Sequence, residues 1–204
     1  MEGARPVRTV RSEDFAGAPT FCITAKMDWW TRRPEHDNRR AVRVYGRPSV
    51  SELRRELLIG EFPRVEDIPW LKQEFAVTAV HNLQDDLDLE LHDLSESELA
   101  RAYRECGIKM VRTPIQDGSA DAMAAELAIA LDALVGLLGA GERVYLHCNA
   151  GLNRAPTLAI AYLHAHCGMS LDEACAYVKA RRACGPFMTI LEDYFGPRDH
   201  KPQR

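Results

Sequence analysis

The sequence lacks the marks of a membrane or secreted protein. No apolar run approaches the ~20 residues that a membrane span needs. The start of the chain, Met-Glu-Gly-Ala-Arg-Pro, does not contain the apolar core of a signal peptide. We therefore expect no membrane partner and a cytoplasmic location, where reducing conditions keep thiols free.

Metal-binding and disulfide patterns are missing as well. The six cysteines are scattered, without the Cys-x-x-Cys pairs or regular spacings of zinc sites and disulfide-rich domains. They are Cys22, Cys106, Cys148, Cys167, Cys175 and Cys184. We expect no metal and no other cofactor.

The chain carries no strong charge of either sign. Its net charge of −4 and its pI near 6.0 argue against a nucleic-acid partner. Arginines cluster locally at residues 32–33, 39–43 and 54–55. Such clusters are usually solvated surface, and the alternative is a rim for an anionic substrate. The length of 204 residues suits one α/β domain, and we expect a monomer.

The most informative stretch is residues 144–157, Val-Tyr-Leu-His-Cys-Asn-Ala-Gly-Leu-Asn-Arg-Ala-Pro-Thr. It predicts a short apolar strand, a glycine-containing loop and a helix that begins near Asn153. The backbone N–H groups of such a loop, at a helix N-terminus, can bind an anion. Arg154 adds a planar fork for two phosphate oxygens. The same positive groups favour the thiolate form of Cys148.

A thiolate held below a bound phosphate can act as a nucleophile and form a phosphocysteine intermediate. The alternative is chance, because Cys-x5-Arg is short and a buried cysteine is often only a small apolar residue. The strand before the loop and the helix after it favour a phosphate loop. Besides the catalytic Cys148 and Arg154, the predicted phosphate-binding residues are His147, Asn149, Ala150, Gly151, Leu152 and Asn153.

These residues resemble the active-site loop of the cysteine-based dual-specificity phosphatases of the protein tyrosine phosphatase superfamily. Within them the chain is most similar to the glucan phosphatases, the group of laforin and the plant starch phosphatases. The loop Cys-Asn-Ala-Gly-Leu-Asn-Arg-Ala-Pro is close to that group's Cys-x-Ala-Gly-x-Gly-Arg pattern. A second match is Leu-Gln-Asp-Asp-Leu-Asp-Leu-Glu at residues 83–90. Asn153 stands where the pattern has Gly; because Asn tolerates left-handed backbone angles, we expect the loop to be preserved.

Strands alternate with helices along the chain, which predicts an α/β fold: a mostly parallel central sheet flanked by helices on both faces. The expected strands are residues 21–24, 56–60, 77–83, 108–115 and 144–147. The expected helices are residues 65–75, 95–106, 120–138, 153–166, 170–182 and 186–195, and residues 84–90 are expected to form a solvated acidic loop. We expect residues 1–54 to be an extension that packs on a catalytic domain at residues 55–195, with a tail at residues 196–204.

A phosphate ester with an alkoxide leaving group needs a general acid, and Asp117 is the candidate. It lies in a glycine-containing loop after the strand at residues 108–115, at the sheet edge where ligands bind in such folds. The resemblance implies the same role, because Asp117 matches the general-acid aspartate of the family. The alternative is Asp121, but an early helix residue more simply stabilises the helix N-terminus.

The resemblance also implies a substrate, a phosphorylated α-glucan such as starch or glycogen. In that family an aromatic residue follows the acid aspartate, whereas this chain has Gly118. Aromatic rings elsewhere could stack on sugars, and the candidates are Trp29, Trp30, Phe187 and Tyr194. Phe187 and Tyr194 are expected to share one face of the last helix, and such a face is more often core.

Three hypotheses follow for function. The first is a glucan phosphatase, and the second is a dual-specificity phosphatase that acts on phosphoprotein or on a small phosphoester. The third is a non-catalytic module that only binds phosphate. The first two share all their chemistry, so only substrate binding can distinguish them.

Overall fold

Short and mostly parallel strands form the centre of the fold. The computed structural model describes residues 46–202, which all belong to the unit Arg40–Arg204. The sheet has five strands in the order β1-β2-β5-β3-β4. They are β1 (Val50–Arg54), β2 (Leu57–Gly60), β3 (Ala79–Asn82), β4 (Lys109–Arg112) and β5 (Val144–His147). Of these, β2, β3 and β5 are buried at every position. All neighbours pair in parallel except β1 and β2, which confirms the predicted mostly parallel sheet.

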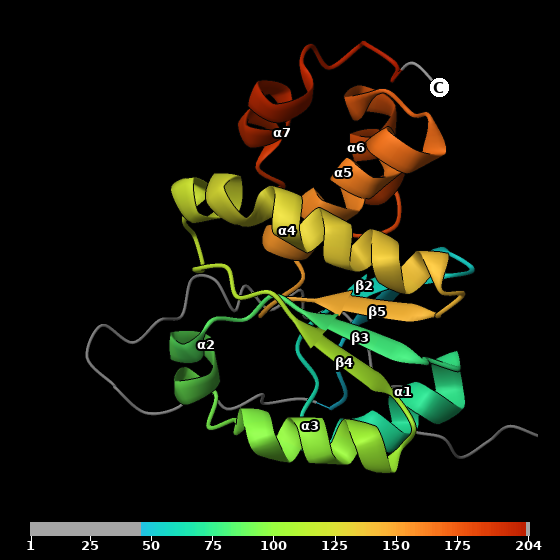
Figure 1. Ribbon diagram of the computed structural model, residues 1–204, viewed down its shortest axis with the longest axis vertical. Helices are drawn as coiled ribbons and strands as arrows, with labels where there is room; N and C mark the ends of the chain where they lie inside the picture. The colour runs from blue at the N-terminus through green and yellow to red at the C-terminus, as the bar shows by residue number, and fades with distance from the viewer. Residues whose placement is uncertain (1–45, 203–204) are drawn as a thin grey trace, which may run out of the picture. The chain divides into compact units, whose positions relative to one another are not determined.

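Helices cover both faces of this sheet (Figure 1). One face carries the 3-10 helix η1 (Val65–Asp67), α1 (Ile68–Phe75) and α3 (Glu96–Glu105). The other face carries α4 (Ala120–Gly139), α5 (Arg154–Cys167), α6 (Leu171–Lys179) and α7 (Met188–Phe195). The short helix α2 (Asp86–Leu91) lies beyond the carboxyl ends of β3 and β4.

The two-residue period of a strand sends side chains to both layers. In β2, Leu57 and Ile59 belong to the core that contains α4 and α5, whereas Leu58 belongs to the core that contains α1 and α3. In β5, Leu146 belongs to the core with α4 and α5, and Tyr145 belongs to the core with α1 and α3. Strands that are buried on both faces have to be nearly continuous apolar runs, and this explains why these strands were visible in the sequence.

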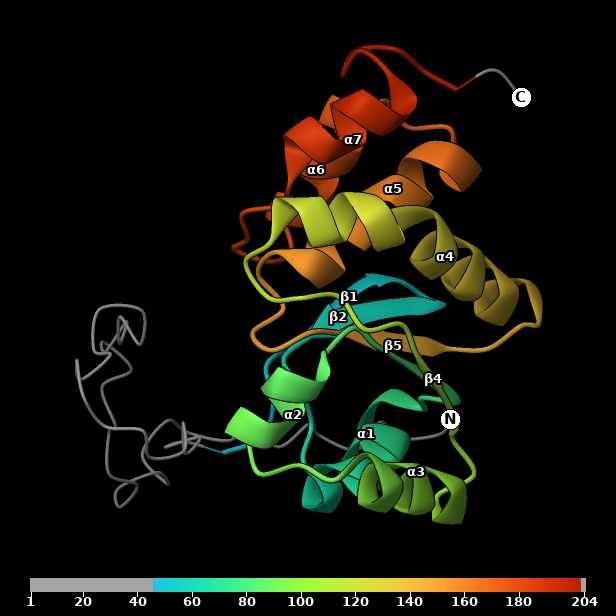
Figure 2. The same cartoon turned by 60° about the vertical axis from the view of Figure 1, so that its left-hand side comes forward.

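Helix α5 is buried on almost every side, between the sheet and its neighbours α4, α6 and α7 (Figure 2). A helix that is apolar all round belongs in a core. Its first residue, Arg154, is itself fully buried. The strand β5 and the helix α5 are therefore both fixed by packing, and the loop between them is held at two rigid ends.

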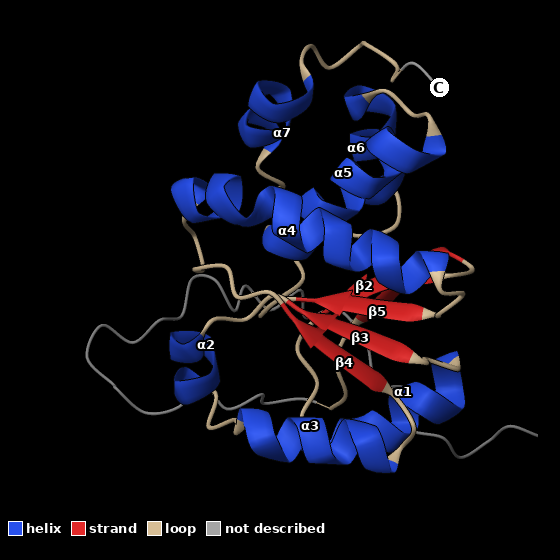
Figure 3. Ribbon diagram, viewed as in Figure 1, coloured by secondary structure: helices blue, strands red, loops and turns tan. Residues whose placement is uncertain are grey.

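Several predicted boundaries differ from the structure (Figure 3). The expected acidic loop at residues 84–90 is wrong, because Asp85 and Asp88 form a reciprocal capping box that starts α2. The last helix begins at Met188 rather than at residue 186. Strand β1 lies in the stretch predicted to be an extension, and it pairs with β2. The expected strand at residues 21–24 lies outside the described residues.

One helix of the described residues, α4, has the length and apolar composition of a membrane span, which the sequence prediction missed. In the structure one face of α4 packs on the core. Its buried residues, among them Leu127 and Leu134, pack in the same cluster as α5, and the acidic residues Asp121 and Asp132 are exposed. Core packing accounts for the buried face of α4, which is 33% of the apolar window.

His81 in strand β3 gives the fold a pH dependence. The side chain is fully buried, and its Nε2 atom lies 2.7 Å from the Thr113 hydroxyl. Burial lowers the pKa of His81 from 6.5 to about 4. Between these two values the unfolded chain binds more protons than the folded one, so the free energy of unfolding falls as the pH drops from 6.5 to 4.

We predict that His81 removes roughly 3 kcal/mol of stability between pH 6.5 and pH 4. Urea unfolding of the wild type and of His81→Gln across this range measures the effect. The wild type should lose that much more stability than the variant, whose amide does not titrate. Parallel pH profiles for the two proteins would contradict the prediction.

Candidate active site

The loop of residues 148–153 connects β5 to α5 at the carboxyl ends of the parallel strands. Cys148 follows the last residue of β5 and is buried. In open α/β sheets this edge is the place where ligands bind. This edge therefore carries three predicted features side by side: the nucleophile, the phosphate-binding loop and the arginine.

The carbonyl groups of this loop are held outward. Consecutive carbonyls accept hydrogen bonds from segments distant in sequence. The pairs are Phe62 N–H to Asn149 O (2.9 Å), Arg182 Nη2 to Ala150 O (2.7 Å), Arg182 Nε to Gly151 O (2.6 Å) and Gly185 N–H to Leu152 O (2.8 Å).

In a planar trans peptide, each C=O and the following N–H point in opposite directions. The N–H groups of residues 150–153 therefore point into the loop. Within residues 46–202 these N–H groups donate no hydrogen bond. Several free N–H groups that converge at the start of a helix form an anion site.

Gly151 is required for this loop by geometry. Its φ is +63°, and a Cβ atom would lie 2.5 Å from the carbonyl oxygen of Gly60. Asn153 takes a right-handed conformation with φ −119°, so the left-handed tolerance expected of this residue is not used. Its amide instead donates to the carbonyl of Gly185 (2.6 Å).

Arg154 makes hydrogen bonds through one side of its guanidinium only. Its Nη1 atom donates to Asp88 Oδ2 (2.6 Å), to the Ile115 carbonyl (2.6 Å) and to the Leu83 carbonyl (3.3 Å). Its Nε and Nη2 atoms are buried, and neither makes a hydrogen bond within residues 46–202. This edge of a guanidinium can donate in parallel to two oxygens of one anion.

The charge of Arg154 is secured by its neighbours. Burial by itself would lower the pKa of its guanidinium, but negative charge at Cys148, Asp88 and Asp117 raises the pKa overall. Arg154 therefore stays a cation in the interior, as a phosphate ligand must. Asp88 is almost fully buried beside it.

Asp117 lies at the open side of the loop. One carboxylate oxygen is 2.9 Å from Arg154 Nη2, and the other accepts a hydrogen bond from Asn149 Nδ2 (3.2 Å). The side chain is about half exposed (49%). The alternative acid, Asp121, is exposed in the first turn of α4. Of the two aspartates, Asp117 is the one that contacts Arg154.

Two site residues were missed in the sequence. Asp88 was placed in a solvated loop, although Asp-x-x-Asp at residues 85–88 is a capping signal that could have indicated a helix. Arg182 gave no signal, because all its partners, the loop carbonyls and the residues Ser49 and Ser51, are more than thirty residues earlier. His147, which was predicted among the phosphate-binding residues, has its Nδ1 atom 3.3 Å from the Cys148 carbonyl oxygen.

The predicted aromatic contacts do not form one surface. Phe187 is the residue before α7, and its N–H donates to the Thr157 hydroxyl (2.8 Å). Tyr194 is half exposed on α7 and contacts the ring of Phe195. Because Phe187 precedes the helix, the expected shared helical face is wrong. Trp29 and Trp30 lie outside the described residues.

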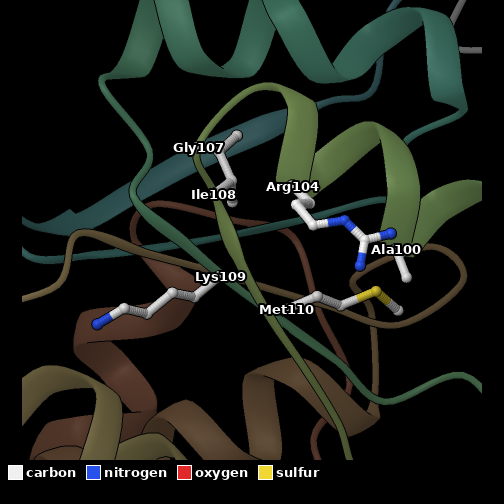
Figure 4. A pocket seen from close by; sticks show the side chains of 6 residues that line it. All are labelled: Ala100, Arg104, Gly107, Ile108, Lys109 and Met110. Carbon is white, nitrogen blue, oxygen red and sulfur yellow. The ribbon is translucent and has the colours of Figure 1, made fainter.

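A surface pocket of about 500 Å³ lies elsewhere, between the end of α3 and the start of β4. Figure 4 shows that its two basic residues, Arg104 and Lys109, extend in different directions. Lys109 is paired with Glu142. The pocket lies at the amino-terminal end of β4, opposite the edge that carries Cys148, and nothing in its lining matches the predicted chemistry.

Residues 57–190 match the dual specificity phosphatase catalytic domain family. The chain belongs to this family. Its matched region contains the nucleophile loop, the arginine and the acid candidate described above. The chain therefore contains the catalytic domain of a cysteine-dependent dual-specificity phosphatase.

Similar proteins include laforin of Mus musculus, 30% identical over 132 residues, or 60% of this chain and 39% of laforin. Phosphoglucan phosphatase DSP4 of Castanea sativa is 30% identical over 145 residues, 69% of this chain and 38% of that protein. Human dual specificity protein phosphatase 1 is 36% identical over 70 residues, 34% of this chain and 19% of that protein. The chain thus spans well under half the length of these relatives.

The solved structure of Tk-PTP in its active form shares the fold. It matches with a TM-score of 0.61 at 24% identity, over 72% of this chain and 95% of that one.

Gly151→Ala should disable the loop. A matched control is Gly107→Ala, because Gly107 also has a positive φ (+65°) but has open space around it. The left-handed conformation alone should cost each variant roughly 1–2 kcal/mol of stability. Only Gly151→Ala adds the clash with Gly60, so its kcat/KM for an aryl phosphate should fall at least ~100-fold.

Unfolding curves and steady-state kinetics of the two glycine variants provide the measurement. Equal kcat/KM values for Gly151→Ala and Gly107→Ala would show that the shape of the loop does not control activity.

Proposed function

We propose that this protein hydrolyses phosphate monoesters, with the Cys148 thiolate as nucleophile. One observation carries the proposal: the inward N–H groups of the loop lie beside the residue that would attack, together with the edge of buried Arg154 that makes no hydrogen bond within residues 46–202. Such preorganised donors stabilise the charge of a phosphoryl transition state without rearrangement. The predicted roles of Cys148, Arg154 and Asp117 are part of this proposal.

In the first step the phosphate takes the Nε and Nη2 donors of Arg154. The contact between Arg154 Nη2 and Asp117 is then released. The Cys148 sulfur bonds to phosphorus while the bond from phosphorus to the ester oxygen breaks, and Asp117 gives its proton to that oxygen. The products of this step are the alcohol and a phosphocysteine.

In the second step water attacks the phosphocysteine. Asp117, now a carboxylate, takes a proton from the water, the phosphorus–sulfur bond breaks, and inorganic phosphate leaves. The Cys148 thiolate is restored. Ala155, which follows the arginine, is fully buried and offers no hydroxyl to the departing thiolate, so we expect this step to be slow.

A phosphorylated α-glucan is the substrate that we propose. Support comes from the phosphoglucan phosphatase of Castanea sativa, whose match extends over 145 residues, about twice the 70 residues that match human dual specificity protein phosphatase 1. The alternative is a phosphoprotein, and the shorter but more similar match to that protein phosphatase favours it. Both substrates would use the same loop.

The substrate can be tested by phosphate release from phosphorylated amylopectin and from 4-nitrophenyl phosphate, with Cys148→Ser as the blank. We expect both to be hydrolysed, the polymer at least as efficiently as the aryl ester, and neither by Cys148→Ser. Turnover of the aryl ester alone would reject the glucan assignment and leave phosphoproteins as the next substrates. Binding of phosphate without any turnover would indicate a non-catalytic module.

A further inference from the structure

Asn149, the residue after the nucleophile, has a side chain with three polar partners. Its Oδ1 atom accepts a hydrogen bond from Gln84 Nε2 (2.8 Å). Its Nδ2 atom donates to a carboxylate oxygen of Asp88 and to Asp117 Oδ2 (3.2 Å). The amide of Asn149 therefore connects two buried residues, Gln84 and Asp88, with the half-exposed acid candidate Asp117.

The buried partners of Asn149 fix the orientation of its side-chain amide. Gln84 is fully buried, and its backbone N–H donates to Asn82 Oδ1 (2.8 Å), which holds the main chain from which the donor to Asn149 Oδ1 extends. Asp88 uses one oxygen for Asn149 and the other for Arg154. Because an amide oxygen only accepts and an amide nitrogen only donates, Asn149 has to present its N–H groups to the two aspartates.

Asp117 is held at two points, and substrate removes one of them. Its Oδ1 atom contacts Arg154 Nη2, and its Oδ2 atom contacts Asn149. A bound phosphate takes the Arg154 edge, because a phosphate dianion and a guanidinium form the stronger, bidentate pair. The hydrogen bond from Asn149 then becomes the contact that keeps Asp117 over the loop.

We propose that Asn149 is a positioning residue for the general acid, an inference that rests on the proposed function. Its N–H pairs with Asp117 Oδ2, and a hydrogen-bond donor favours the unprotonated oxygen of a carboxylic acid. The proton is therefore placed on Oδ1, the oxygen that lies 2.9 Å from Arg154 Nη2 and is left beside the bound phosphate when Arg154 releases it. Asn149 contacts neither that oxygen nor the proton.

The leaving group provides a sharp test. Phenyl phosphate has a poor leaving group and needs the acid, whereas 4-nitrophenyl phosphate has a good leaving group and needs it far less. Asn149→Ala should lower kcat/KM for phenyl phosphate at least about 10-fold more than for 4-nitrophenyl phosphate, a fraction of the 10²–10⁴ that general acids contribute. Asn149→Ser, which keeps a hydroxyl beside Gln84, should show the same difference if the alanine variant does not fold.

Asn153→Ala is the matched control. It removes an asparagine amide from the same loop, but that amide binds Gly185 on the outside and not Asp117. We expect it to lower kcat/KM for both esters by the same factor. In an Asp117→Asn background, Asn149→Ala should add no further difference between the two esters, because two residues that act through one group are not additive.

Equal losses for both esters in the Asn149 variants would overturn the positioning role and leave the proposed function in place. The positioning role would also be overturned if Asn149→Ala added a leaving-group difference in the Asp117→Asn background. Turnover of neither ester by the wild-type protein would instead overturn the proposed function, and this inference with it.

Discussion

A guanidinium that is fully buried at the start of α5 is the constraint on which the site depends. A charge in a protein interior has to be paired and hydrogen-bonded, because desolvation costs several kcal/mol. Arg154 meets this need with the Leu83 carbonyl after β3, Asp88 on α2 and the Ile115 carbonyl after β4. Three segments that follow strands at the carboxyl edge of the sheet thus contact the same guanidinium. These hydrogen bonds use only Nη1; on the edge that suits a phosphate, Nη2 contacts Asp117, and a phosphate would replace that contact.

The loop beside Arg154 is shaped from outside rather than by its own contacts. Phe62, Arg182 and Gly185 come from distant parts of the chain, and each draws a loop carbonyl outward. Arg182 is a second buried arginine, and it joins the loop carbonyls of Ala150 and Gly151 to Ser49 and Ser51. Because these bonds exist before any phosphate arrives, the inward N–H groups need no rearrangement when charge develops. The hydrogen bonds from these distant residues thereby stabilise an unusual backbone conformation of the loop, which includes the positive φ of Gly151.

The sequence allowed the sheet, the nucleophile loop and the position of Asp117 to be predicted because each has a local signal. Buried strands are continuous apolar runs, and Cys148 and Arg154 lie six residues apart in one strand–loop–helix unit. Asp88 and Arg182 were missed because their partners are far away in sequence. From the sequence alone, an acidic stretch or a lone arginine predicts solvated surface. Phe187 was misplaced by its helical spacing, since α7 begins one residue later. Local periodicity cannot show which polar side chain will be buried against a distant backbone.

The most direct measurement is to trap the covalent intermediate. The Asp117→Asn variant lacks the base for the second step, so it should accumulate phosphocysteine when mixed with 4-nitrophenyl phosphate, whose leaving group needs little acid. Acid quench followed by mass spectrometry of the peptide that contains residue 148 would detect it. We expect one phosphoryl group on Cys148, and none in the Asp117→Asn, Cys148→Ser double variant. Burst release of nitrophenol with an unmodified Cys148, or a phosphoryl group on another residue, would contradict the account.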